Sequence, residues 1–429
     1  MRVAVIGAGI VGVTTAFELA ADGHQVTVFE RRASVAEETS FANAGVVAPG
    51  YVTPWAAPGM PGKVLGHLFS AHAPVRLAWP FASGQLGWLW RWWRACRPAT
   101  FAANRSRMYR LARYSQQRLH TLTRVLALEY EQAQGYLVLL RTARDVAQAR
   151  GGLKLLAEMG VDFHLVKPER ARQIEPGLNP QTALHAAIHL AGDEVGNCRH
   201  MAQLMRAQAE ALGAQFRFGR QVLAIAAGTT PGVRHRAAGG TEPSRDDAFD
   251  AVVVCAALGS VALLRPLGIR LPLLAVHGYS VTAPLRLLEG YPNVGPQAGV
   301  MDEKYKVAIS RLGNRVRVAG SAELGGRPDR HNPAAIQTLY KVLDDWFPGC
   351  AQRAPGQSAV QAWKGARPML PDGPPVLGAS GCDGVWLNLG HGSSGWALSC
   401  GSARVLADLL AGRVPAIDTE GLGLARLKA

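Results

Sequence analysis

Residues 2–30 read RVAVIGAGIVGVTTAFELAADGHQVTVFE, and they carry the clearest structural pattern of the chain. Apolar and β-branched residues over 2–6 predict a buried parallel strand. A GxGxxG turn follows at once, a helical pattern runs over 13–21, and 25–29 predicts a second strand. This order of strand, glycine turn, helix and strand is typical of the first βαβ unit of a doubly wound sheet.

The three glycines of the turn have separate physical roles. Gly7 permits the tight turn, Gly9 lets a pyrophosphate approach the backbone, and Gly12 lets the helix pack closely on the strand. The start of the helix offers free N–H groups and a partial positive charge to phosphates. Glu30, at the end of the second strand, suits a ribose diol and repels the extra phosphate of NADP. We therefore predict a dinucleotide site; the alternative is a glycine-rich turn in an unrelated α/β protein.

The chain after Glu30 favours FAD over NAD. A simple NAD dehydrogenase continues with further βα units, whereas here a polar, glycine-containing segment follows at 38–45, and then Pro-Gly-Tyr at 49–51. The α/β alternation therefore breaks off, which indicates that a second domain is inserted after the first βαβ unit.

Composition and charge limit the classes of partner. The chain has 429 residues, of which 48% are hydrophobic and 18% charged, which is a globular balance with room for two interleaved domains. The net charge of +15 suits nucleic acid, an anionic membrane surface or an acidic substrate. Because the arginines are scattered, with no basic run and no zinc-finger spacing, we expect a membrane surface rather than nucleic acid.

The cysteines and the N-terminus exclude several other classes. Six cysteines lie far apart without a CxxC pair, so we predict no metal site and reduced thiols in the cytoplasm. The apolar start of the chain is interrupted by glycines at a meaningful spacing, so it is interpreted as fold rather than as a signal peptide. The sequence contains no uninterrupted run of about 18 apolar residues, so we expect no membrane-spanning helix.

Hydrophobic periodicity predicts the remaining elements. Residues 55–134 are largely helical, 192–196 form a turn, and 228–247 form a hairpin or an exposed loop. Further helices are expected at 147–159, 200–212 and 336–346, and strands at 135–140, 161–166, 214–218, 222–226, 251–259, 276–284, 307–310 and 315–319.

The fold class is therefore α/β. We predict a Rossmann-type FAD-binding domain with an interleaved α+β substrate domain, which is built on a mostly antiparallel sheet. The cofactor domain is expected to be discontinuous, over 1–54, 190–270 and 355–429, and the substrate domain to cover 55–189 and 271–354.

With these segments placed, nearly the whole chain resembles the bacterial D-amino acid dehydrogenases, within the wider D-amino acid oxidase and glycine oxidase superfamily. The resemblance rests on the glycine turn with Glu30 and on a series of blocks in order. These blocks are TSFANAG at 39–45, PGY at 49–51, PWAAPG at 54–59, HGYS at 277–280, YKVAISR at 305–311, GARPMLPDG at 365–373, LGHGSSGW at 389–396 and SCGS at 399–402. One departure is Ser393-Ser394, where close relatives have Thr-Leu.

The resemblance implies an FAD enzyme that oxidises a D-amino acid to a 2-oxo acid and ammonium, by hydride transfer from Cα to flavin N5. It implies that Arg367 holds the substrate carboxylate, for which a guanidinium fork is suited. Arg311 is a second candidate cation, and Tyr279 and Tyr305 are candidates to close the pocket, each weighed against plain packing. His391 is a candidate base, but more readily a neighbour of the flavin.

The resemblance also implies the cofactor contacts. Because Met369 follows Arg367-Pro368, where a covalently bound flavin would need a cysteine, we expect non-covalent FAD. The residues expected to bind it are Gly7, Gly9, Ile10, Val11, Gly12, Glu30, Arg31, Ser40, Ala44, Gly45, Val222, Gly259, Gly390, His391, Gly392, Ser393, Ser394 and Gly395.

Residues 86–94, LGWLWRWWR, combine four tryptophans with two arginines. Such a segment suits a membrane interface, and it equally suits a helix whose tryptophans pack in a core. The resemblance favours the membrane, because these dehydrogenases pass electrons to a respiratory quinone rather than to oxygen. We therefore expect a cytoplasmic protein, peripheral on the inner face of the plasma membrane.

Three alternatives remain open from the sequence. One is a glycine or sarcosine oxidase-like enzyme that uses oxygen, and a second is a D-proline or D-hydroxyproline dehydrogenase. The third is a non-catalytic flavin-binding subunit. The preferred side chain of the substrate, the electron acceptor and the oligomeric state are not readable from the residues.

Overall fold

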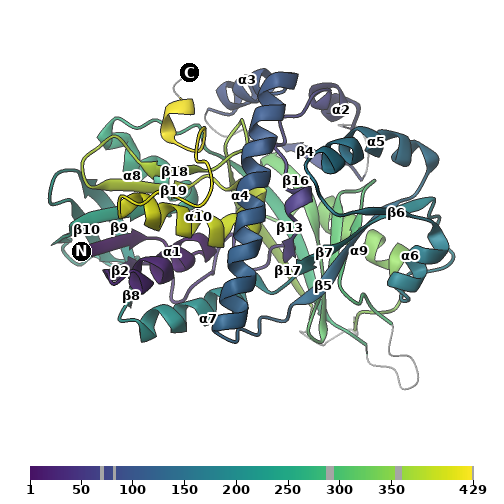
Figure 1. The fold of residues 1–429 in the computed structure, drawn as a ribbon, viewed down its shortest axis with the longest axis horizontal. Helices are drawn as coiled ribbons and strands as arrows, with labels where there is room; N and C mark the ends of the chain where they lie inside the picture. Colours follow the sequence, from purple (N-terminus) through teal and green to yellow (C-terminus); the bar gives the residue numbers. More distant parts are fainter. Residues whose placement is uncertain (68–71, 81–83, 287–293, 353–359, 428–429) are drawn as a thin grey trace.

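The computed structural model describes residues 1–67, 72–80, 84–286, 294–352 and 360–427. A six-stranded and a ten-stranded β-sheet stand side by side, and the long helix α4 (Pro98–Val125) crosses between them (Figure 1). The smaller sheet contains the N-terminal βαβ unit, and the larger sheet is built mostly from the middle of the chain.

The six-stranded sheet has the predicted doubly wound core. Its strands, in spatial order, are β18 (Val376–Ala379), β19 (Val385–Leu389), β12 (Ala251–Val254), β1 (Arg2–Ile6), β2 (Gln25–Phe29) and β8 (Gln215–Arg217). All neighbours pair in parallel except β18 with β19. β1 and β12 are apolar on both faces because α1 (Ile10–Ala21) and α10 (Gly395–Leu410) cover one side. A three-stranded sheet of β9 (Arg220–Ala226), β10 (Gly232–Ala237) and β11 (Arg245–Ala248) packs on the other side.

The ten-stranded sheet carries the other half of the molecule. Its strands are β17 (Gln361–Met369), β13 (Leu274–Pro284), β16 (Arg315–Gly325), β15 (Val307–Leu312), β14 (Gly299–Asp302), β5 (Ala133–Leu140), β7 (Ala186–Val195) and β3 (Val46–Val47), with β4 (Val75–Ala78) and β6 (His164–Val166) at its margins. The β14–β5 and β16–β4 pairs are parallel, and the other pairs are antiparallel. Helix α9 (Pro333–Trp346) packs its apolar side on one face.

Helices fill the remaining described segments. They are α2 (Met60–His67), α3 (Gln85–Ala95), α5 (Ala143–Glu158), α6 (Pro168–Ile174), α7 (Cys198–Ala211) and α8 (Ser260–Leu264), with short 3-10 turns that include η1 (Pro49–Tyr51) and η4 (Gly392–Ser394). The stretch expected to be largely helical thus contains α2, α3 and α4, together with the short strand β4.

One sequence expectation is wrong. Residues 192–196 were expected to form a turn, but β7 continues through them to Val195. Asp193 and Glu194 are buried in this strand, and the Glu194 carboxylate meets His120 Nε2 at 3.2 Å. Tertiary pairing therefore overrides the local turn preference of Gly, Asp and Glu.

The expected domain boundaries stay a prediction. The boundary between 354 and 355 lies outside the described residues, and β17, expected in the cofactor domain, joins the larger sheet. The C-terminal chain therefore reaches the larger sheet before it returns to the smaller one.

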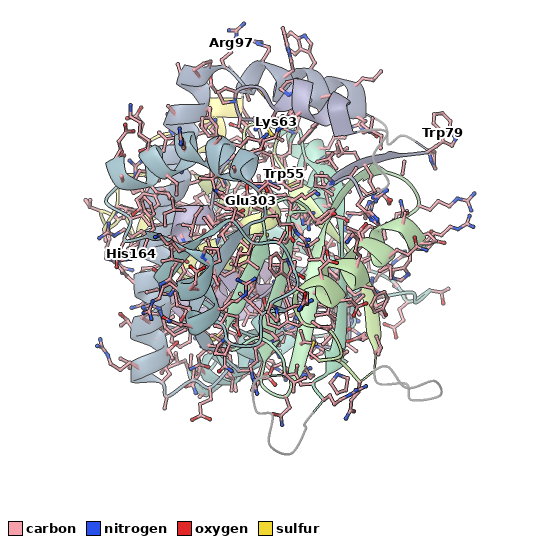
Figure 2. All side chains as sticks on the ribbon, turned by 90° about the vertical axis from the view of Figure 1, so that its right-hand side faces the viewer. Trp55, Lys63, Trp79, Arg97, His164 and Glu303 are labelled. Carbon is pink, nitrogen blue, oxygen red and sulfur yellow. The ribbon has the colours of Figure 1, made fainter. Side chains whose placement is uncertain are left out.

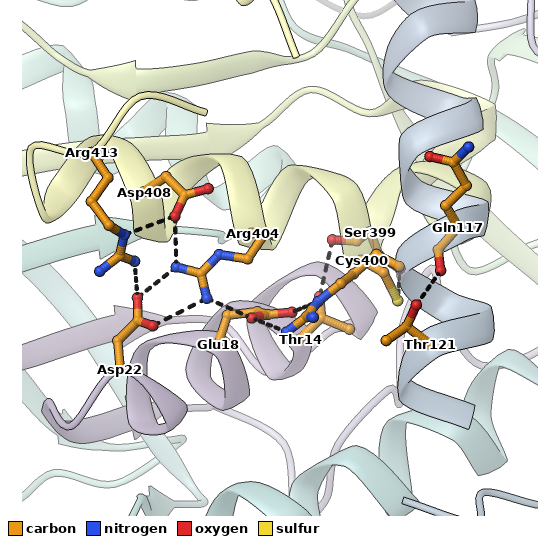
Figure 3. Close-up of polar contacts among 11 residues, drawn as sticks. Thr14, Glu18, Asp22, Gln117, Thr121, Ser399, Cys400, Arg404, Asp408 and Arg413 are labelled. Carbon is orange, nitrogen blue, oxygen red and sulfur yellow. Dashed lines mark hydrogen bonds and ion pairs between the residues drawn. The ribbon is translucent and has the colours of Figure 1, made fainter. Parts of the chain in front are cut away.

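A cluster of ion pairs fixes α10 against α1 and α4 (Figure 3). The buried Glu18 carboxylate accepts hydrogen bonds from Nε and Nη2 of Arg118, at 2.7 and 2.8 Å. It also forms an ion pair with Arg404 at 2.9 Å. Arg404 also pairs with Asp22 at 2.5 Å and Asp408 at 3.0 Å. Because charge-assisted forks are geometrically specific, this cluster sets where the start of α10 lies relative to the first glycine turn.

Candidate active site

A cavity of about 1600 Å³ lies between the two sheets. Residues from the first glycine turn, from the 36–55 segment, from the 255–263 segment that follows β12 and from the 389–397 stretch all line it. The two glycine-rich stretches, one near each end of the chain, therefore face the same space, as the dinucleotide prediction requires.

The glycine turn fits a pyrophosphate. A Cβ on Gly12 would lie 1.9 Å from Gly7 O, and one on Gly7 would lie 2.8 Å from Cys255 O, so the protein itself requires both glycines. A Cβ on Gly9 would meet only Ser40 Oγ, at 3.5 Å, and would otherwise project into the cavity. The packing of the protein therefore does not require glycine at position 9. A ligand that occupies the cavity next to the backbone would require it. Helix α1 begins there without a cap from its own N-cap residue, and the Ile10 N–H donates to Ser40 Oγ at 3.1 Å. The positive end of the helix dipole therefore faces the space where an anion would bind.

Glu30 lines the cavity beside this turn. Its Oε2 accepts the N–H of Ala8 and its Oε1 the N–H of Arg32, both at 2.8 Å. The carboxylate is therefore held in one orientation at the end of β2, next to the expected phosphates. That arrangement suits a ribose diol and disfavours a ribose phosphate.

Three side chains of the larger sheet hold the segment that follows. Ser280 Oγ donates to the Ala42 carbonyl and Ser310 Oγ to the Ala44 carbonyl, both at 2.7 Å. Arg317 Nη1 donates to the carbonyl between them, that of Asn43, at 3.2 Å, and burial without an acidic partner lowers the pKa of Arg317 to about 10. The substrate-side sheet thereby positions a loop of the cofactor side.

The polar residues of that anchor were not singled out from the sequence. Ser310 follows an apolar run in β15, whereas Ser280 and Arg317 alternate with apolar residues along β13 and β16, and this alternation is the available signal. It indicates two differently covered faces without indicating what covers them.

Arg367 reaches the cavity from β17. Its Nη1 donates to the Ser321 carbonyl at 2.9 Å, and its Cζ lies 5.8 Å from the centre of the Trp55 ring. A Cβ on Gly278, on the neighbouring strand β13, would lie only 2.2 Å from Arg367 Nη2. Within the described residues no carboxylate pairs with this guanidinium, and burial lowers the pKa of Arg367 to about 10. Its free donors can therefore bind an anion that enters the cavity.

The other catalytic candidates lie less favourably. The Tyr279 phenol donates to Glu323 Oε1 at 2.8 Å, within the cluster that packs on α9. Tyr305 and Arg311 do not line the cavity: the Tyr305 ring lies against Arg141, and Arg311 donates to the carbonyls of Gly313 and Pro296. The roles of Tyr305 and Arg311 remain predictions without a contact to the cavity, whereas Tyr279 does line it.

His391 lies in the cavity wall and is neutral. Its Nε2 is 2.9 Å from Ser402 Oγ, and burial lowers the pKa of His391 to about 3. A ring with so low a pKa is a poor proton acceptor at neutral pH. The geometry favours a neighbour of the cofactor over a base.

The other residues expected to bind the cofactor line the same cavity, with the exception of Gly12. They are Ile10, Val11, Arg31, Ser40, Ala44, Gly45, Val222, Gly259, Gly390, Gly392, Ser393, Ser394 and Gly395. Gly12 acts behind the turn, where it allows helix α1 to pack.

A polar cluster that the sequence did not indicate lies on the opposite wall. The Tyr51 hydroxyl donates to the Glu303 carboxylate, which also pairs with the Lys306 ammonium. Lys306 Nζ lies 3.4 Å from Tyr51 Oη, and its backbone has a positive φ of 53°. Pro-Gly-Tyr at 49–51 was conspicuous in the sequence, but its partners come from the β14–β15 turn.

Comparison with known proteins identifies relatives over the whole chain. The model of a family described as FAD dependent oxidoreductase matches residues 2–409. A D-amino acid dehydrogenase of Cereibacter sphaeroides is 42% identical over 434 residues, which cover 100% of this chain and 96% of that protein. A D-amino acid dehydrogenase of Allorhizobium ampelinum is 41% identical, with 100% and 99% covered.

Solved structures share the fold at lower identity. Glycine oxidase from Geobacillus kaustophilus superposes with a TM-score of 0.75 at 21% identity, with 99% of each chain covered. L-proline dehydrogenase from P. horikoshii superposes with a TM-score of 0.74 at 16% identity, with 100% of this chain and 97% of that chain covered. At this identity the likeness concerns the fold alone.

Proposed function

The chain belongs to the family of FAD-dependent oxidoreductases, and we propose that it oxidises the Cα–N bond of D-amino acids to yield 2-oxo acids and ammonium. The observation that carries this proposal is the Arg367 guanidinium, which pairs with no carboxylate of the described residues and lies in the same cavity as the glycine turn that fits a pyrophosphate. A substrate with one carboxylate can be held there beside the cofactor.

When bound, FAD supplies the two-electron acceptor that takes a hydride from the substrate. The residues of the chain supply binding and orientation. Arg367 can fork onto both oxygens of an α-carboxylate, and its bond to the Ser321 carbonyl limits its own rotation. A fixed carboxylate leaves the Cα little freedom, which is the main contribution a protein makes to such a reaction.

The electrostatics of the site also favour loss of the substrate ammonium proton. Arg367 carries a positive charge, and the neutral His391 adds none. A nearby cation disfavours a second positive charge, so the neutral amine that the reaction needs is stabilised relative to ammonium. We propose no dedicated base, and the role of these residues is to orient the substrate and to limit its charge.

Anaerobic mixing with a panel of amino acids tests the proposed function. The FAD-loaded protein should lose its flavin absorbance with D-amino acids and keep it with L-amino acids, glycine and sarcosine. Bleaching by glycine or sarcosine instead, with peroxide formed in air, would identify an oxidase of the second kind. Bleaching by D-proline alone would narrow the substrate, and a flavin that no amine reduces would contradict the proposal.

The first prediction concerns Gly9. In Gly9→Ala the new methyl group meets no packing obstacle but occupies space at the start of α1, where the pyrophosphate binds. We expect the protein to stay folded and its affinity for FAD to fall about tenfold, measured by fluorescence titration of the flavin-free protein. Gly23→Ala is unsuitable as a control. No atom lies within 4 Å of the added Cβ, but the φ of +82° at Gly23 would strain an alanine.

The control for that prediction is Gly151→Ala, on the exposed side of α5. No atom lies within 4 Å of its added Cβ and its backbone is helical. It should leave the FAD affinity unchanged. An unaltered affinity in Gly9→Ala as well would show that the phosphates do not approach this turn.

We further propose that the electron acceptor is a membrane quinone and that helix α3 docks on an anionic bilayer. Trp88 is buried and donates its Nε1–H to the Met369 carbonyl, whereas Trp90 and Trp93 are 56% and 58% exposed. Helix α3 thus packs Trp88 in the core and exposes Trp90 and Trp93 at the surface, so both interpretations of this segment apply to it. Its exposed side also carries Leu86, Arg91 and Arg94, and the exposed Arg97 follows between α3 and α4.

The neighbouring surface extends this exposed side. Trp79 is 80% exposed and projects from the outline of the molecule, and Arg97 lies at its edge (Figure 2). Indoles at the headgroups and arginines beside anionic lipid are the usual signature of interfacial binding. None of the described helices is both long and apolar enough to cross a bilayer.

Our second prediction tests this surface. The double variant Trp90→Ser, Trp93→Ser should lower binding to vesicles that contain an anionic lipid about tenfold, measured by co-sedimentation of the FAD-loaded protein. Val414→Ser removes an apolar side chain that is 93% exposed elsewhere, and it should bind as the unmodified protein does. Equal binding by all three proteins would refute the docking of α3.

A further inference from the structure

A second buried guanidinium lines the cavity and has no assigned role. Arg105, on α4, is only 9% exposed and makes no hydrogen bond or ion pair with any described residue. Its Nε is sealed from solvent without a partner, while its two terminal nitrogens are not sealed. Arg105 lines the cavity, so a ligand in the cavity can reach the terminal nitrogens that remain accessible. A buried cation without a partner is costly unless a ligand completes the site.

The packing of α4 on α10 places Arg105 at the start of α10. Gly401 of α10 lies against Ser115 of α4, where a Cβ would be 2.8 Å from Ser115 Cβ. Leu111 and Leu398 share a core cluster about one turn earlier in both helices. The two helices therefore run in the same direction, and Arg105 lies roughly level with η4 and the first residues of α10.

Contacts at the start of α4 agree with this register. Asn104 Nδ2 donates to the Asp372 carbonyl at 3.1 Å, and a Cβ on Gly373 would lie 3.2 Å from Met108 Sδ. This loop follows β17, whose last residue, Met369, forms a β-bridge to His391. Arg105 and the His391–Gly395 stretch therefore belong to the same end of the cavity.

That end is also the N-terminus of a long helix. α10 has 16 residues, no side-chain cap and no acidic residue in its first turn. The positive end of its dipole and the N–H groups around its start are thus opposed by no side-chain cap and by no carboxylate of its first turn. Together with a guanidinium they make a site for negative charge.

We propose that Arg105 and the N-terminus of α10 form an anion site that holds the pyrimidine edge, N1–C2=O, of the isoalloxazine of FAD. This edge gains negative charge when the flavin accepts a hydride, so a fixed cation beside it favours reduction. Arg105 would then act on the cofactor, while Arg367 acts on the substrate. The proposal depends on FAD, the cofactor of the family, and not on the identity of the amine substrate.

The test is the reduction potential of the FAD-loaded enzyme without substrate, measured by equilibration with a reference dye. Arg105→Gln should shift the equilibrium about tenfold toward oxidised flavin, which is ~30 mV for a two-electron couple. Arg113→Gln removes one positive charge from an exposed position on the same helix, and it should leave the potential unchanged.

Arg105→His gives an independent result, which remains useful if Arg105→Gln fails to retain FAD. An imidazole is charged at about pH 5 and neutral at about pH 9. The deficit in potential relative to the unmodified enzyme should therefore be small at the lower pH and grow toward the higher one. A deficit that does not depend on pH would contradict the proposal.

Two further outcomes would overturn the proposal. The potential of Arg105→Gln could be unchanged while KM for D-alanine rises more than about tenfold; Arg105 would then bind substrate rather than flavin. Equal shifts in Arg105→Gln and Arg113→Gln would reveal a general field effect instead of a site.

Discussion

Replacing Arg367 by Met should lower kcat/KM for D-amino acids about 1000-fold, chiefly through KM. Two charge-assisted hydrogen bonds to one carboxylate contribute about 4 kcal/mol together, and that free energy corresponds to this factor. Arg367 has no carboxylate partner within the described part of the chain, so its removal strips no ion pair from the protein. The substitution therefore tests substrate binding more than stability.

The measurement is steady-state oxidation of D-alanine, together with the change in flavin absorbance on binding benzoate, a carboxylate that is not oxidised. Arg367→Lys keeps the charge but cannot fork, so we expect it to recover only about tenfold. The matched control is Arg172→Gln, which removes a guanidinium that donates to the Pro180 and Thr182 carbonyls outside the cavity. If Arg367→Met kept more than about a tenth of kcat/KM and bound benzoate normally, another group would hold the carboxylate.

The parts of the fold that could be predicted from sequence are those with a local cause. The first βαβ unit is readable because strand, glycine turn, helix and strand follow one another without a break, and part of the glycine requirement is local: a Cβ on Gly12 would lie 1.9 Å from Gly7 O. Apolar runs such as 251–254 are readable because a strand covered on both faces has no polar position. The predicted ends of these elements lie within a few residues of the observed ones.

The end of β7 shows why other parts could not be predicted. Gly192, Asp193 and Glu194 have the composition of a turn, yet β5 pairs with this segment and the Glu194 carboxylate meets His120 of α4. Those partners are distant in sequence, so no local pattern announces them. His120 gives the buried Glu194 carboxylate a partner, whereas Asp193 Oδ2 is buried without a hydrogen bond to any described residue.

The candidate site divides in the same way. Arg367 and the predicted cofactor glycines belong to recognisable blocks, and all of them except Gly12 line the cavity. Tyr305 lies in a recognisable block as well, but its ring packs by Arg141 outside the cavity, because side-chain direction depends on turns and bulges that no motif specifies. Arg105 had no motif at all, and only the packing of α4 on α10 gives it a place.

Gly278→Ala should lower kcat/KM about 100-fold although no functional atom is removed. The added Cβ would lie 2.2 Å from Arg367 Nη2 and 2.5 Å from its Cζ, so the guanidinium has to move. The obstacle is a flexible side chain rather than backbone, and the strand conformation of residue 278 accepts alanine. We therefore expect the fold and the FAD content to persist while the carboxylate loses its fixed position, since a displacement of about 1 Å costs that much.

A double variant separates this explanation from general damage. If Gly278→Ala acts only by displacing Arg367, adding it to Arg367→Met should cost nothing further, because the flexible thioether replaces the group that the methyl would strike. The readouts are kcat/KM for D-alanine and the temperature of unfolding, with Gly151→Ala as the control substitution. Additive losses in the double variant would mean that Gly278 contributes by another route, such as direct contact between its backbone and the substrate.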